Sequence, residues 1–92
     1  MKSLHTLVKI AQRKLDELGI EAAKIAQEVS ELEAREASVR AREAAELANA
    51  ARDATFASML PAYRLRVKWQ IDEIRAQAAA KADALGDVRK RL

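Results

Sequence analysis

The sequence predicts an all-α protein, a long two-helix antiparallel coiled-coil hairpin with helices over about 3–52 and 59–92 and no β-strand. Alanine, glutamate, lysine, leucine and arginine dominate its 92 residues, a composition typical of coiled coils and long helices. Two segments repeat apolar residues every three or four positions. The chain has only two glycines and one proline, so few turns are available. We expect one domain, 1–92, because a chain this short holds at most one.

A heptad pattern in the N-terminal half predicts the first helix. Apolar residues follow alternating steps of four and three, which is the spacing of a coiled-coil seam. The seam contains Leu4, Val8, Ala11, Leu15, Leu18, Ala22, Ile25, Val29, Leu32 and Val39. Glu36, Glu43 and Glu46 fall where apolar residues belong, so the pattern weakens toward the end. The stretch up to about Arg52 still favours a helix because it is rich in alanine.

A second periodic segment predicts the other helix. Its apolar residues are Phe56, Leu60, Tyr63, Val67, Ile71, Ile74, Ala78, Ala82, Leu85, Val88 and Leu92. Several consecutive steps of four lengthen the period, which indicates a weaker supercoil than in the first helix.

The segment FASMLPAYRLRVKW, residues 56–69, holds the only proline and all three aromatic residues. Proline is tolerated in the first turn of a helix but costs about 3 kcal/mol in its interior. We therefore expect the turn near 53–59, with Pro61 opening the second helix and Asp53, Thr55 or Ser58 as its cap. The alternative is one long helix, kinked at Pro61, that pairs with a copy of itself.

The two predicted helices differ in length. The first spans about 50 residues, or roughly 75 Å at 1.5 Å per residue, and the second is shorter. With the turn near Phe56, Leu92 should lie opposite about Ile20. The seam residues from Leu4 to Leu18 then have no partner within the chain. An apolar stripe left in water indicates a binding surface or a dimer seam.

Charge is distributed unevenly along the chain. Residues 21–53 carry five basic and eight acidic groups, whereas residues 54–92 carry eight basic and four acidic groups. An antiparallel hairpin places these two segments side by side, so we expect charge pairs along the flanks of the seam.

No motif predicts an active site, a cofactor or a metal centre. The chain has no cysteine and one histidine, His5, and it lacks a glycine-rich phosphate loop. No apolar run is long enough for a secretory signal or a membrane span. We expect a non-enzymatic protein of the cytoplasm without membrane insertion.

Nucleic-acid binding is a weaker alternative. Arg64, Arg66 and Lys68 interleave with aromatic residues, but Asp72 and Glu73 interrupt the basic surface, and phosphate-binding faces are usually one-sided. Trp69 lies off the apolar stripe, so it either covers lysine and arginine stems or is exposed for a partner.

Two stretches carry a family resemblance. The segment SLHTLVKIAQRKLDELGIEAAKIAQEVSELEA resembles the start of FliJ, a flagellar type III export protein, and MLPAYRLRVKWQIDEI resembles the beginning of that family's second helix. The chain departs from the family in a shorter second helix and in a shorter connection without glycine. The resemblance covers most of the chain, through heptads and alanine that many coiled coils share.

The resemblance implies a stalk. Its helix termini would enter the centre of a hexameric export ATPase, another part of the hairpin would contact the membrane export gate, and escort chaperones would bind as well. The protein would then work in the cytoplasm, at the periphery of the flagellar basal body. The residues expected at the ATPase are Leu4, Leu7, Val8, Lys9, Ala11, Arg13, Lys14 and Leu15. Those expected at the gate are Tyr63, Val67, Ile71 and Ile74, although packing against the first helix also explains them. The rival interpretation is a coiled-coil spacer that forms a homodimer through its seams.

Overall fold

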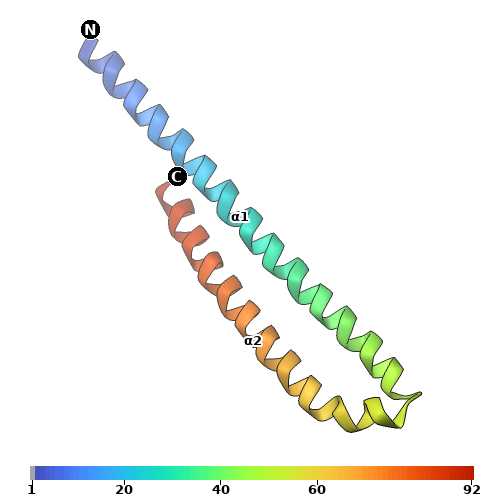
Figure 1. Cartoon of the computed structure of the whole chain (residues 1–92). Coiled ribbons are helices and arrows are strands. Elements are labelled where there is room, and N and C mark those ends of the chain that lie inside the picture. The colour runs from blue at the N-terminus through green and yellow to red at the C-terminus, as the bar shows by residue number, and fades with distance from the viewer. Residues whose placement is uncertain (1) are drawn as a thin grey trace.

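The computed structural model describes residues 2–92, which form two long antiparallel helices and, over that range, no β-strand. Helix α1 spans Lys2–Ala50 and helix α2 spans Ala54–Arg91. The two pack along one another into a rod with extents of 80 × 16 × 12 Å (Figure 1). The predicted hairpin is confirmed, and the alternative of one long kinked helix is not what the chain forms.

The turn is tighter than the sequence suggested. It occupies residues 51–53, whereas we expected 53–59, and α2 begins at Ala54. Asp53 is the N-cap, with extended backbone angles of φ −140° and ψ 119°, and its carboxylate accepts a 2.8 Å hydrogen bond from the Thr55 amide. This one extended residue reverses the chain, so no residue from 2 to 92 adopts a positive φ. A glycine is therefore not required at this turn.

Pro61 lies inside α2, so its predicted place in the first helical turn is wrong. The early cap at Asp53 is the reason, because it starts the helix at Ala54, seven residues before the proline. Pro61 has no amide hydrogen for the Ala57 carbonyl, and its ring crowds the preceding turn. Figure 1 shows the first turns of α2 bent away from the direction of the rest of the helix, as an interior proline causes.

The core is a single interhelical seam. Its buried side chains are Leu32, Ala50, Val67, Ile71, Ile74, Leu85 and Val88. Leu18, Ala22, Ile25 and Val29 of α1 are half-buried and extend this seam toward the N-terminus. The periodicity predicted these residues in both helices except Ala50, which lies beyond the predicted seam of the first helix.

Three predicted seam residues of α2 are exposed and differ from the prediction, namely Phe56, Ala82 and Leu92. Ala82 is exposed, whereas Lys81 is half-buried and pairs with Glu28 of α1. The seam therefore steps from Ala78 to Lys81 to Leu85, which is ordinary heptad spacing. The aliphatic stem of Lys81 can cover apolar surface while its ammonium group reaches the carboxylate. Charge pairing thus selects a register that a count of apolar residues alone does not.

Candidate protein-binding surfaces

Two ion pairs join the helices along the flanks of the seam. The Arg75 Nε donates to the Glu36 carboxylate at 2.6 Å, and Lys81 pairs with Glu28. The pairs lie eight residues apart on α1 and six apart on α2, in opposite directions along the chain. This is the expected contact between the acidic middle and the basic final third.

These partners lower the pKa of both glutamates. Hydrogen bonding from Arg75, assisted by Arg40 at 3.4 Å, holds the pKa of Glu36 below its ordinary value. The hydrogen bond from Lys81 likewise lowers the pKa of Glu28. The carboxylate of Glu36 in turn raises the pKa of Arg75. Because Glu36 sits at a seam position, these contacts explain how a charged residue is tolerated there.

The N-terminal part of α1 extends beyond the end of α2, as Figure 1 shows. Every side chain from residue 3 to residue 17 is exposed, and Leu18 is the first that is half-buried. We call residues 3–17 the overhang. At 1.5 Å per residue it projects by roughly 22 Å. This confirms the predicted unpartnered stripe, except that Leu18 already touches the paired region.

The overhang carries all eight residues expected at the ATPase. Its exposed apolar residues include Leu4, Leu7, Val8 and Leu15, and Ala11 is exposed on the same stripe. Lys9, Arg13 and Lys14 are exposed cations beside it, and the described part of the chain shows no ion pair for them. The overhang is therefore an apolar stripe with a basic border.

The four residues expected at the export gate are less exposed than the residues of the overhang. Val67, Ile71 and Ile74 are buried against α1, so they are unavailable to a second protein while the helices are packed. Tyr63 is half-buried. It lines a small cavity of about 170 Å³ near the turn, together with Glu46, Ala50, Phe56, Met59, Leu60 and Arg66. Of these lining residues, Phe56 and Met59 are strongly exposed.

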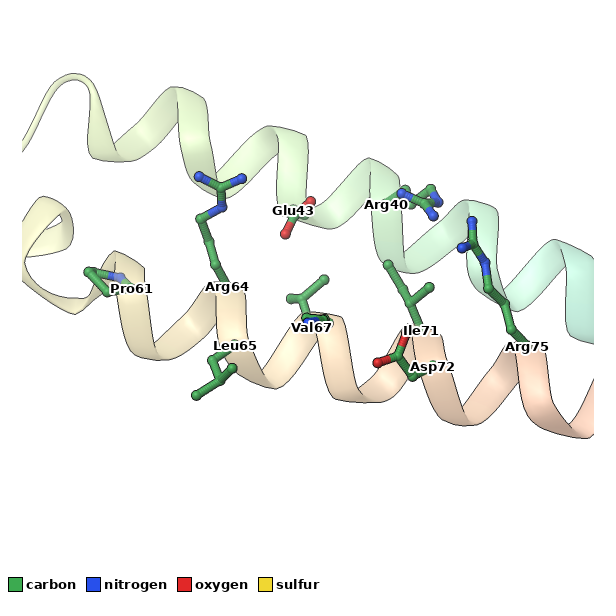
Figure 2. A pocket seen from close by; sticks show the side chains of 10 residues that line it. Arg40, Glu43, Pro61, Arg64, Leu65, Val67, Ile71, Asp72 and Arg75 are labelled. Atoms are coloured by element: carbon green, nitrogen blue, oxygen red, sulfur yellow. The ribbon is translucent and has the colours of Figure 1, made fainter.

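A second hollow, of about 560 Å³, lies between the helices closer to the middle of the rod. Val67 and Ile71 are among its lining residues, and so are Arg40, Arg64, Lys68 and Arg75. Figure 2 shows Arg64 directed toward α1, while Leu65 points to the side of α2 that faces away from α1. Glu43 and Asp72 line it as well, so the hollow carries four cations and two carboxylates.

The sequence assigned no role to Leu65 and left Trp69 either covering basic side-chain stems or exposed for a partner. Leu65 and Trp69 are 47% and 61% exposed, and they lie four residues apart on α2. The spacing to the seam was the available signal, because each lies two residues, or about 200° of helix rotation, from Val67. They therefore face away from α1.

The described residues contain no group of three or more histidine, cysteine, aspartate or glutamate side chains placed to hold a metal ion. Among residues 2–92, no helix has the length and apolar character needed to cross a bilayer. Searches of family models, curated proteins and solved structures found no match to this chain.

Proposed function

We propose that this protein is a non-enzymatic, rod-shaped component of flagellar protein export that resembles FliJ. In this proposal it works in the cytoplasm at the basal body, as a stalk that engages the hexameric export ATPase and also contacts the export gate and escort chaperones. The observation that carries the proposal is the overhang, a heptad stripe that remains exposed while the rest of the seam is paired.

A helical rod suits a mechanical role. The rod is 80 Å long, and from Leu18 onward its two helices are held together by one seam and by cross-helix ion pairs. The projecting single helix is narrow enough for a pore, since an α-helix with its side chains is about 10–12 Å wide. Its exposed leucines and valine would pack against apolar pore residues, and Lys9, Arg13 and Lys14 would pair with carboxylates around them.

Contact with the export gate requires a different surface from the one expected. Tyr63 is the only one of the four expected residues that is not fully buried, and it lies beside the exposed Phe56 and Met59. We propose the gate contact at this end of the hairpin, far from the overhang. The two ends of the rod would then serve different partners.

A homodimeric coiled-coil spacer is the second candidate function. The same exposed stripe favours it, because an unpaired heptad seam can also pair with a second copy. The two candidates differ in measurable mass. A spacer forms a stable dimer on its own, whereas a stalk is a monomer that associates with the ATPase.

The test is ATP hydrolysis by a flagellar export ATPase with and without this protein, alongside masses from light scattering. We expect faster hydrolysis and ATPase hexamer formation, both lost when Leu4 and Val8 are replaced by aspartate. Ile20→Asp is the matched control, because Ile20 is 72% exposed and lies on α1 opposite the seam. No stimulation, together with a homodimer mass, would contradict the stalk.

A further inference from the structure

The small cavity near the turn lies where α2 bends at Pro61. We call it the tip cavity, and its volume is about 170 Å³. Helix α1 contributes Glu46 and Ala50 to its lining. The α2 residues that line it lie on both sides of Pro61, and they are Phe56, Met59, Leu60, Tyr63 and Arg66. Figure 1 shows the first turns of α2 inclined to the rest of the helix, so the walls come from two differently inclined stretches of α2 and from α1.

The hairpin does not fill this cavity with its own side chains. Ala50 is buried at its base, and Leu60 and Tyr63 are half-buried. Phe56 and Met59, however, are 47% and 62% exposed, although phenylalanine and methionine are among the residues most often buried in proteins. Five of the seven lining residues are apolar or aromatic. An apolar group placed in the cavity would therefore cover surface that the hairpin leaves in water.

The size of the cavity limits what can enter it. A protein cavity of about 150 Å³ with apolar walls is large enough to bind benzene, and the tip cavity is close to that size. It therefore has room for one six-membered ring, and a whole helix or an indole with its second ring fits less well.

The lining favours an aromatic ring over an aliphatic side chain. Phe56 and Tyr63 can make offset or edge-to-face contacts with a third ring. The thioether sulfur of Met59 packs well against aromatic rings, and the guanidinium group of Arg66 is attracted to a ring face. An aliphatic group would gain only from its apolar area.

Glu46 adds a requirement for a hydrogen-bond donor. It lies seven residues after Val39, at the same position of the heptad, and it is half-buried. Glu28 and Glu36 pair with cations of α2, whereas the described part of the chain shows no ion pair for Glu46. A carboxylate only accepts hydrogen bonds, and a partly buried acceptor is stabilised when a donor reaches it. A ring that carries a hydroxyl supplies that donor.

We infer that the tip cavity receives one tyrosine side chain of another protein, with its ring among Phe56, Met59 and Tyr63 and its hydroxyl donating to the Glu46 carboxylate. Tyr63 is the only tyrosine of this chain and already lines the cavity, so a second copy could supply a tyrosine only by opening its own cavity. The inference rests on the proposed gate contact for the protein that supplies the tyrosine, but the cavity can be tested without that protein.

The test uses the full chain with ¹³C-labelled methionine methyl groups. Met59 is one of two methionines and lines the cavity, so a ring bound there shifts its methyl signal in NMR spectra. The variant Met59→Leu identifies that signal. The probe is p-cresol, which is the tyrosine side chain, and toluene is the same ring without the hydroxyl. We expect p-cresol to bind with a Kd of about 1 mM and toluene about fivefold more weakly.

Two variants separate the hydroxyl contact from the ring contact. Glu46→Ala removes the acceptor, so it should weaken p-cresol about fivefold and change toluene binding by less than about twofold. Ala50→Leu fills the cavity from its base, so it should weaken both probes at least about tenfold. Ala48→Leu is the matched control, because Ala48 is exposed on α1 and does not line the cavity. Circular dichroism checks that each variant keeps its helical content.

Three results would overturn the inference. One is an unchanged Met59 methyl signal up to about 10 mM p-cresol, and another is toluene binding as tight as p-cresol binding. The third is a shift that persists in a folded Ala50→Leu variant, which would place the probe elsewhere. These outcomes are distinct from failure of the stalk, because p-cresol binding without stimulation of the ATPase would support the cavity and contradict the stalk.

Discussion

Two parts of α1 share one heptad pattern but differ in what covers them. Leu4, Val8 and Leu15 in the overhang follow the same four-and-three spacing as Ile25, Val29 and Leu32 in the paired part. The overhang residues are exposed, whereas Leu32 is buried and the other two are half-buried. A heptad therefore specifies which face of a helix is apolar, while the length and register of the second helix decide how much of that face is occupied.

The largest expected effect is a difference in unfolding free energy between a substitution in the paired seam and one in the overhang. Ile74 is 3% exposed in the paired seam, so Ile74→Ala removes buried methyl groups and should cost about 2–4 kcal/mol of unfolding free energy. Leu4→Ala in the overhang should cost less than about 0.5 kcal/mol, because the side chain is already in water. Urea unfolding followed by circular dichroism measures both. A similar loss for both variants would mean that the overhang is also packed.

A smaller effect of opposite sign is expected at the bend of α2. Pro61→Ala gives the Ala57 carbonyl an amide partner and removes the ring clash, so the hairpin should stay folded and gain about 1–3 kcal/mol. The same urea experiment detects the gain as a higher midpoint. A loss of stability would indicate that the bend is needed to close the turn onto α1.

The smallest expected effect concerns acid. The pKa values of Glu28 and Glu36 are lowered in the folded protein, so their ion pairs stabilise it above the ordinary glutamate pKa near 4.5. That contribution falls as the pH drops through the lowered values. The Glu28→Gln, Glu36→Gln variant should therefore be less stable near neutral pH and lose less stability on acidification.

This acid effect can be located within the molecule. Glu17→Gln in the overhang is the control, because Glu17 is exposed and makes no ion pair within the described residues. Its acid profile should match that of the unaltered protein, and added salt should shrink the difference seen for the double variant. If stability depends on pH in the same way for the unaltered protein, the double variant and Glu17→Gln, the ion pairs do not contribute to acid sensitivity.

Periodicity and charge predicted most of the fold, because a two-helix rod has few other ways to bury its apolar residues. Most of the buried face of each helix, the pairing of acidic and basic segments and the overhang follow from one-dimensional patterns. The start of α2 did not follow, because proline statistics favoured Pro61 in the first turn while the single cap hydrogen bond of Asp53 started the helix earlier. The seam position of Lys81 was missed because it depends on the ion pair with Glu28, and the sequence alone does not show which residues pair across the helices.

The candidate surfaces were predictable to a different degree. The overhang followed from helix lengths alone. The gate residues Val67, Ile71 and Ile74 were chosen from the same apolar stripe that builds the core, and a seam residue cannot serve both roles in a closed hairpin. The outward position of Leu65 and Trp69 is implied by their spacing from Val67, but their exposure depends on which face of α2 is covered by α1.

The most direct test of the central claim, that α1 carries a free seam for a partner, is amide hydrogen exchange along α1. In the purified protein we expect residues 22–50 to exchange at least about tenfold more slowly than residues 5–15, because unpaired helix opens locally at little cost. Adding a hexameric flagellar export ATPase should slow exchange in residues 5–15 alone. Equal protection of both segments in the free protein, or no change when the ATPase is added, would contradict the claim.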